Sequence, residues 1–271
     1  MRLGHHANAW GGVVGHPAGV TSIKDLFYLT PGDTLATLGE VAAAGYEGVE
    51  LFDGNLAEFA ADIGRLRAAL EERSLHLIAV YSGANLIFED VLADELWRIR
   101  RACEWAAQLG AEHLVVGGGA QRTEPPAPAD YDRLAAALDD VARIADGHGL
   151  LASFHPHLST IVETADQIER VLARAEIRFC PDTGHLQAAG GDPVELLRAF
   201  RDRIDYVHLK DLDAGGAFVP LGQGVVDLAG LVAVLRETGF DGWITVETDG
   251  WDGDPAEGAR ASLRHLRALL D

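Results

Sequence analysis

The feature that most constrains the fold of this 271-residue chain is a regular alternation of short apolar runs with longer segments whose apolar residues recur at helical spacing. Helices are predicted in the longer segments, among them residues 57–73, 91–109, 130–147 and 228–238. The short runs are rich in β-branched and other apolar residues, which is typical of buried strands. Eight strands are predicted, at residues 3–10, 48–52, 75–81, 113–117, 150–155, 177–182, 206–210 and 243–247.

Strands that alternate with helices pair in parallel through right-handed crossovers, and eight such units close into an α/β fold, the (β/α)8 TIM barrel. We predict one barrel domain over residues 1–271, a length within the range of roughly 200 to 400 residues known for this fold. A doubly wound open sheet is the rival, but no Gly-x-Gly-x-x-Gly follows the first predicted strand. The glycines at 117–119 and 222–224 follow later strands and are interpreted as turns.

The chain is strongly acidic, with 22 basic and 42 acidic residues and a formal charge of −20. This charge repels phosphate backbones and argues against nucleic-acid and anionic-membrane partners. No window approaches the ~20 apolar residues that cross a bilayer, and we expect a cytoplasmic protein. Cys103 and Cys180 lie far apart in the sequence and imply no disulfide framework.

Polar residues gather where the predicted strands end, which is the functional end of a TIM barrel. The starts of the strands carry only ordinary turn residues. This one-sided distribution is the strongest functional signal in the sequence. The residues at the strand ends are Glu50, His155 and His157, Asp182 and His185, His208 and Lys210, and Glu247, while the first strand carries His5, His6 and Asn8.

The alternation of strand side chains sharpens this prediction, because residues two apart point to the same face. In Tyr206-Val-His-Leu-Lys210, we expect His208 and Lys210 to face the barrel axis together. His155 and His157 project to one side if the backbone around Pro156 stays extended. Gly184 is expected to let the chain turn, so that His185 comes back over the opening.

One residue from each of four neighbouring strands then forms a candidate metal site: His155, Asp182, His208 and Glu247. A mixed nitrogen and oxygen set suits one divalent ion, with manganese or cobalt as the first expectation and zinc, iron or magnesium as alternatives. A single histidine or carboxylate at a strand end is more often a hydrogen-bonded or capping group than a ligand. Converging buried acids and histidines, however, cost several kcal/mol unless they are paired or bind a metal.

Other groups near the predicted site have more than one interpretation. Adjacent side chains point to opposite faces, so at most one of His5 and His6 faces the site, and His6 is taken as a substrate contact. Glu50 either orients substrate or accepts a hydrogen bond from a metal-ligating residue, without itself touching the metal. Trp10 either stacks on a substrate ring or packs in the core.

These residues resemble the xylose isomerase-like TIM-barrel family of sugar isomerases, epimerases and dehydratases, over essentially the whole chain. The segments that carry the resemblance are His-Pro-His-Leu-Ser-Thr-Ile-Val-Glu-Thr, Asp-Thr-Gly-His-Leu-Gln-Ala-Ala-Gly-Gly-Asp-Pro, Val-His-Leu-Lys-Asp and Pro-Leu-Gly-Gln-Gly-Val-Val-Asp, and they are similar to the inosose dehydratase branch. The family holds a divalent metal with Glu, Asp, His and Glu, which correspond by position to His155, Asp182, His208 and Glu247. His155 departs from this pattern, because the epimerases place there a glutamate that also transfers protons.

The resemblance implies abstraction of a proton next to a carbonyl, followed by loss of a β-hydroxyl from a carbohydrate or cyclitol. His157 and His185 are expected to act as base and acid, Lys210 to contact substrate and neutralise developing charge, and Glu247 to serve in both metal binding and catalysis. A ketose epimerase or sugar isomerase, a lyase that cleaves 3-keto-glycosides, a zinc-dependent DNA-repair endonuclease and a non-catalytic sugar-binding module are the alternatives. A homo-oligomer is left open.

Overall fold

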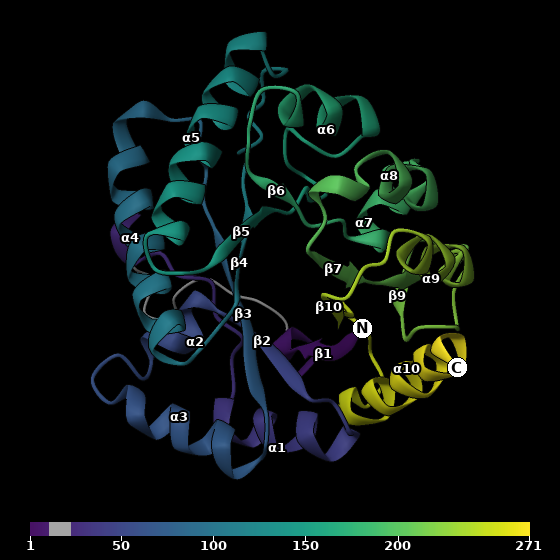
Figure 1. Cartoon of the computed structure of the whole chain (residues 1–271). Coiled ribbons are helices and arrows are strands. Elements are labelled where there is room, and N and C mark those ends of the chain that lie inside the picture. The colour runs from purple at the N-terminus through teal and green to yellow at the C-terminus, as the bar shows by residue number, and fades with distance from the viewer. Residues whose placement is uncertain (11–22) are drawn as a thin grey trace.

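The computed structural model describes residues 1–10 and 23–271, and these residues form the expected TIM barrel (Figure 1). The sheet has the order β6-β5-β4-β3-β2-β1-β10-β7, and all its neighbouring strands pair in parallel. A parallel bridge between Asp182 and His208 links the two outer strands of this order. The strands are β1 (Arg2–His6), β2 (Gly48–Phe52), β3 (His76–Gly83), β4 (His113–Gly117), β5 (Leu151–Phe154), β6 (Arg178–Phe179), β7 (Tyr206–Leu209) and β10 (Trp243–Val246).

Helices surround the sheet on its outer side (Figure 1). The α-helices are α1 (Thr34–Ala44), α2 (Asp53–Ala57), α3 (Ile63–Glu72), α4 (Glu89–Gln108), α5 (Pro128–Asp146), α6 (Ala165–Leu172), α7 (Thr183–Ala188), α8 (Pro193–Ala199), α9 (Leu228–Glu237) and α10 (Pro255–Leu270). Short 3-10 turns are η1 (Ala7–Trp10), η2 (Ile23–Asp25) and η3 (Arg201–Arg203). Among the helices described, none is long and apolar enough to cross a membrane.

Strand alternation divides the core into two layers, as the sequence predicts. Val207 and Leu209 of β7 pack in the layer between strands and helices. Tyr206 of the same strand lies inside the barrel with Val115 and Trp243. His208 and Lys210 therefore share the inner face with Tyr206, and both are completely buried.

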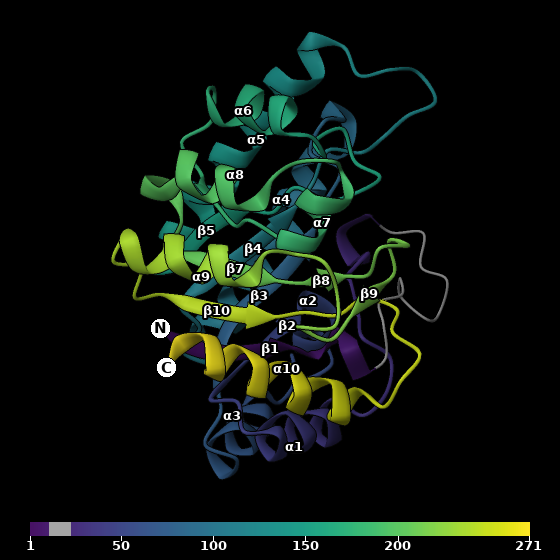
Figure 2. The same cartoon turned by 90° about the vertical axis from the view of Figure 1, so that its right-hand side faces the viewer.

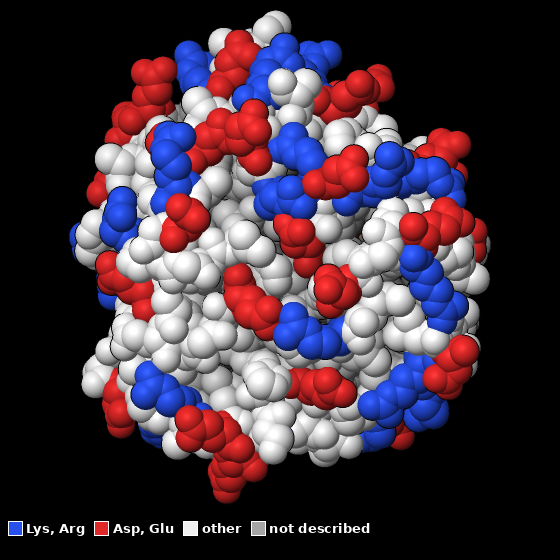
Figure 3. Space-filling model, in the orientation of Figure 1, with Lys and Arg blue, Asp and Glu red and all other residues white. Residues whose placement is uncertain are grey.

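All the barrel strands run in one direction, so their carboxyl ends meet at one end of the barrel (Figure 2). The opposite end, where the strands begin, faces the viewer in Figures 1 and 3. Acidic and basic side chains are interspersed on that face (Figure 3). The strand starts thus carry a mixed-charge surface, while the expected functional residues lie at the other end.

Three predicted elements differ from the structure. The first strand is predicted to reach residue 10 but ends at His6, because the 3-10 turn η1 begins at Ala7. The sixth strand is shortened to Arg178–Phe179, since Pro181 has no N–H to donate to a ladder. The helix predicted at 57–73 is two helices, α2 and α3, and α2 begins directly after β2.

A short antiparallel hairpin extends the chain beyond β7. It consists of β8 (Asp211–Leu212) and β9 (Phe218–Val219). The buried carboxylate of Asp211 accepts backbone N–H groups of Leu212, Gly222, Gly224 and Val226, which fixes the loop that follows the hairpin. Gly222 has a φ of 84°, which confirms the interpretation of this segment as a turn.

The packing of the barrel interior limits the size of the side chain at residue 48 in β2. A Cβ atom on Gly48 would lie 2.6 Å from Ile78 Cγ2 and 3.1 Å from Trp243 Cζ3, so Gly48→Ala overpacks the interior. We expect the free energy of unfolding, measured by denaturant titration, to fall by about 1–3 kcal/mol. Gly39→Ala in α1 is the matched control, because its nearest neighbour is the Arg73 side chain at 3.6 Å, and it should raise stability by about 0.5–1 kcal/mol. Equal effects of the two substitutions would contradict this account of the core.

Candidate active site

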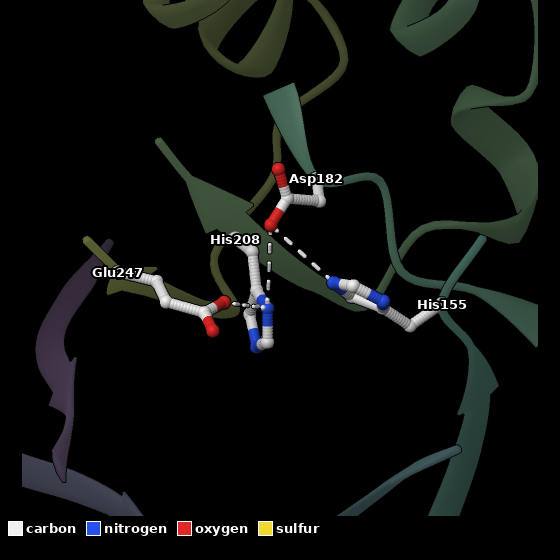
Figure 4. Close-up of side chains that lie close together, drawn as sticks. All are labelled: His155, Asp182, His208 and Glu247. Atoms are coloured by element: carbon white, nitrogen blue, oxygen red, sulfur yellow. Dashed lines mark hydrogen bonds and ion pairs between the residues drawn. The ribbon is translucent and has the colours of Figure 1, made fainter. Parts of the chain in front are cut away.

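Four side chains at the carboxyl ends of neighbouring strands point toward one another inside the barrel (Figure 4). They are His155 after β5, Asp182 after β6, His208 on β7 and Glu247 after β10, and we call them the metal-ligand cluster. One ligand atom from each lies within 4.8 Å of the others, and all four residues are buried. His155 Nε2 lies 3.3 Å from Asp182 Oδ2, and His208 Nδ1 lies 2.8 Å from Glu247 Oε2.

The bonding of this cluster fits a cation. His208 Nδ1 and Glu247 Oε2 are buried 2.8 Å apart, and while the proton of a neutral His208 is on Nε2, neither of these two atoms can donate a hydrogen bond to the other. Buried polar atoms are costly without a partner. A divalent ion between the two imidazoles and two carboxylates would coordinate both atoms, and this donor set suits a transition metal. The residues present therefore fit one divalent metal ion.

Hydrogen bonds behind the cluster orient His208. Glu50 Oε2 accepts a hydrogen bond from His208 Nε2 at 2.8 Å and another from the Tyr206 hydroxyl at 2.5 Å. With its proton on Nε2, a neutral His208 would present the lone pair of Nδ1 to a cation beside Asp182 and Glu247. A carboxylate that fixes a histidine in this way is the usual support of a metal-bound imidazole.

His6 adds to this support from β1. The backbone N–H of Asn8 donates to His6 Nδ1 at 3.0 Å, so the ring proton is on Nε2, which lies 3.6 Å from Glu50 Oε1. His6 and Glu50 are both completely buried beneath the ligands. Glu50 bonds to His208, as in the second of its two predicted roles, and the substrate contacts expected for His6 and Glu50 stay predictions.

Charges close to one another shift the pKa values of the ligands. Burial opposes ionisation of His208, but the carboxylates of Glu50 and Glu247 outweigh it and raise the pKa of His208 well above its ordinary value. Burial likewise opposes ionisation of Asp182, but Lys210 and His185 hold its pKa well below the usual range. Lys210 and His208 lower the pKa of Glu247 in the same way. The carboxylates thus stay ionised, the form in which they bind a metal.

A second cluster, formed by His157, His185 and Asp249, lies beside the first. The rings of His157 and His185 are 3.9 Å apart between centroids, and His155 lies 5.7 Å from each of them. His157 and Asp249 are partly exposed, whereas His185 is buried. Burial, followed by the charge of Lys210, lowers the pKa of His185 to about 2, so this imidazole is neutral.

Lys210 connects the two clusters. Its Nζ lies 3.1 Å from Asp182 Oδ2 and 3.4 Å from Glu247 Oε2 in the first cluster. It lies 2.7 Å from Asp249 Oδ2 and 3.1 Å from His185 Nε2 in the second. The side chain is completely buried, and the ring of Phe218 in β9 lies 5.1 Å from the ammonium.

The Asp-Thr-Gly-His segment is built differently from the expected turn. Asp182 caps helix α7: its Oδ1 accepts the backbone N–H of His185 at 2.9 Å, and its Oδ2 faces the metal-ligand cluster. Gly184 lies within this helix. A Cβ there would lie 2.9 Å from Lys210 Cβ and from Phe218 Cε1, so glycine is required for close packing, and the prediction of a glycine turn was wrong.

Trp10 packs against the hydrophobic core beside β1 and α1. Its ring is 4.9 Å from that of His5, and its indole N–H donates to Glu40. His5 also contacts Tyr46, whose hydroxyl bonds to the Ala259 carbonyl of α10. Trp10 therefore packs toward the helices, and the alternative of core packing describes its position.

Sequence reasoning missed two residues of the site, Asp249 and Tyr81, and assigned no role to a third, Asn8. Asp249 follows Glu247 by two positions, the spacing that placed His157 beside His155, so the same rule would have found it. Tyr81, on β3, has its ring 5.6 Å from that of His155. Asn8 donates its two amide hydrogens to Glu247 Oε1 at 2.7 Å and Asp249 Oδ1 at 2.8 Å, a contact across 239 residues or more that no local pattern signals.

A cavity of about 570 Å³ opens beside His157, on the side of β3 and β4. Tyr28 and Tyr81 line it together with the backbone of residues 117–119. A Cβ on Gly117 would lie 2.1 Å from the Tyr81 hydroxyl oxygen, so the glycine leaves room for this ring. The volume is within the range of small-molecule sites, roughly 300–1,000 Å³.

The model of the xylose isomerase-like TIM barrel family matches residues 38–269 of the chain. The chain belongs to this family. Its relatives include inosose dehydratase of Geobacillus kaustophilus, which is 31% identical over 81% of this chain and 80% of its own length. Inosose dehydratases recur among the relatives of this xylose isomerase-like protein, and it is an enzyme of the dehydratase or isomerase type.

Solved structures share the barrel throughout. D-psicose 3-epimerase from Clostridium cellulolyticum H10 superposes with a TM-score of 0.80 at 15% identity, over 100% of both chains. The IOLI protein, solved with a bound zinc atom, superposes with a TM-score of 0.78 at 17% identity, over 100% of this chain and 98% of that one. At these identities the similarity shows the xylose isomerase-like fold alone.

The support of His208 by Glu50 is testable. We expect Glu50→Gln to weaken binding of Mn²⁺ about 10–100-fold, because the uncharged amide no longer fixes His208 with Nδ1 free. Isothermal titration calorimetry measures the affinity, and circular dichroism checks that the fold persists. Glu40→Gln, next to Trp10 and away from the clusters, is the matched control and should leave the affinity unchanged. Unchanged affinity in Glu50→Gln would remove Glu50 from this role.

Proposed function

We propose that this protein is a divalent-metal-dependent lyase that removes a proton α to a carbonyl of a keto-cyclitol or keto-sugar and eliminates a β-hydroxyl as water. The observation that carries the proposal is the metal-ligand cluster: four buried ligand atoms within 4.8 Å of one another, at the end of the barrel where this fold places its chemistry. Titratable groups that are not ligands lie directly beside it. Elimination next to a carbonyl needs a polarising cation, a base and a proton donor, and the site offers groups for each role.

His155, Asp182, His208 and Glu247 would hold the metal, with manganese or cobalt as the proposed ion. Bound there, a divalent ion supplies Lewis-acid polarisation of a carbonyl oxygen. The IOLI protein, solved with a zinc atom, has the same fold, which supports a metal in a barrel of this kind. Asn8 holds Glu247 through Oε1 and leaves Oε2 directed at His208.

His157 is the proposed base. Its Nδ1 lies 2.7 Å from the Leu158 carbonyl oxygen, which can only accept a hydrogen bond, so the proton is on Nδ1. The lone pair of Nε2 is then free to take the α-proton. His157 is partly exposed and lines the cavity, whereas His185 is buried with its Nε2 against Lys210.

Lys210 is proposed to neutralise the negative charge on the departing hydroxyl by donating a hydrogen bond, and His185 holds it in place. The three carboxylates around the ammonium outweigh the cost of burial and raise its pKa, so it stays charged. A charged donor aimed into a site that excludes water favours the negative charge that develops on the leaving oxygen. The proton that completes the departing water would come from His157, which holds it after removing the α-proton, and not from the neutral imidazole of His185.

Elimination fits this arrangement better than epimerisation. Two-base epimerisation requires a base on each face of the reacting carbon. His157 and His185, the two histidines of the second cluster, are 3.9 Å apart between ring centroids, so they do not offer bases on two opposite faces of a substrate. The relatives named inosose dehydratase, at 25–31% identity, support the same choice of reaction.

The ligand assignment is tested with Glu247→Gln. We expect this substitution to abolish Mn²⁺ binding and turnover together, because it removes a charged ligand oxygen from the cluster. Metal content after gel filtration and loss of water from inososes and keto-sugars are measured in parallel. Glu237→Gln, at the exposed end of α9, should change neither. A fully metallated, active Glu247→Gln variant would overturn the assignment.

The base is tested by exchange of the α-proton with deuterium. We expect His157→Ala to retain metal but to lose exchange in D₂O, followed by nuclear magnetic resonance of the keto-substrate. His76→Ala, an exposed histidine at the start of β3, is the control and should exchange like the unmodified protein. Exchange that persists in His157→Ala would exclude His157 as the base. Products show which bond is cleaved: a dehydratase forms a dione or enone, an epimerase does not, and a glycoside-cleaving lyase releases an alcohol.

A further inference from the structure

The second cluster raises a question that the proposed reaction leaves open. His157, His185 and Asp249 present three ligand atoms within 4.8 Å of one another, the same closeness as in the metal-ligand cluster. They come from three different segments: the turn after β5, helix α7 and the turn after β10. Such convergence of two imidazoles and a carboxylate is a metal-binding arrangement in its own right.

Each of the three residues offers a hydrogen-bond acceptor. His157 carries its proton on Nδ1, bonded to Leu158, so Nε2 is a lone pair. His185 Nε2 lies 3.1 Å from the Lys210 ammonium, which can only donate, so this nitrogen also accepts. Asp249 Oδ2 accepts from Lys210 at 2.7 Å. Three acceptors that face one another need a positive group to hold them together.

The positive group in this structure is the Lys210 ammonium. It reaches His185 and Asp249 of the second cluster and also contacts Asp182 and Glu247 of the first. The three carboxylates that it touches carry a charge of −3. One divalent ion in the metal-ligand cluster and one ammonium supply +3, so the charges of this group of residues balance with a single metal ion.

We propose that Lys210 occupies a second cation position of the site, and that an uncharged side chain at residue 210 opens this position to a second divalent ion, bound by His157, His185 and Asp249. The inference rests on the proposed one-metal function. The inference explains why the site has ligands for two ions but room for only one. The metal-ligand cluster is open to an ion, whereas the Lys210 ammonium occupies the second cluster and cannot dissociate, because it belongs to the chain.

Lys210→Met is the main variant, because methionine is similar in length and has no charge. We expect it to bind one more Mn²⁺ ion per chain than the unmodified protein, counted by plasma mass spectrometry after gel filtration. Electron paramagnetic resonance provides a second readout, since two Mn²⁺ ions in adjacent clusters broaden each other's signal. Lys210→Gln repeats the test with a polar side chain, so that a fold defect of one variant does not decide the outcome.

Two controls complete the design. Lys24→Met removes an exposed lysine that pairs with Asp25 and should leave the ion count unchanged. Lys210→Met combined with Asp249→Asn removes a proposed ligand and should return the count to that of the unmodified protein. An equal ion count in the unmodified protein, Lys210→Met and Lys210→Gln overturns the inference. Failure of the proposed function gives a different result, because the unmodified protein then binds no ion. The inference is judged only by the increase in bound Mn²⁺ ions from the unmodified protein to the Lys210 variants.

Discussion

The backbone bridge between Asp182 and His208 is the point on which both the fold and the site depend. It links β6 and β7, the two outer strands of the sheet, and the N–H of His208 donates to Pro181 O at 3.0 Å. The residues of the bridge also supply two of the four side chains of the metal-ligand cluster. Closing the barrel therefore brings the ligands together, and no separate loop movement is needed. Ligands on or close to the ends of closed strands, as here, are held more firmly than ligands on loops.

Much of this site was predictable because strands have a simple geometry. The two-residue period placed His208 and Lys210 on the inner face, and the position of polar residues at strand ends brought together His155, Asp182 and Glu247. Both rules need only the sequence positions of the strands. They hold because parallel strands of a barrel all end on the same side.

The predictions failed where contacts are long-range or where the backbone leaves the strand. Residues 7–10 continue the polar pattern of β1 but form η1, which turns Asn8 toward Glu247 and Trp10 toward Glu40. Gly184 lies within helix α7, where most residues would fit the backbone. Glycine is required because Phe218, in a hairpin more than 30 residues later, packs against this position. Nothing in a local sequence pattern reports such approaches, because they depend on how distant segments pack.

The β8–β9 hairpin has a consequence for how such barrels diversify. Phe218 lies over the Lys210 ammonium and 5.4 Å from the His185 ring, so an element outside the barrel sheet shields the charged groups from water. The strength of every charge interaction beneath it depends on the local dielectric. A change confined to residues 211–226 would thus alter the polarity of the reaction space while each ligand kept its place. Reactivity in this fold can therefore change through the hairpin that covers the site as well as through the metal-ligating residues.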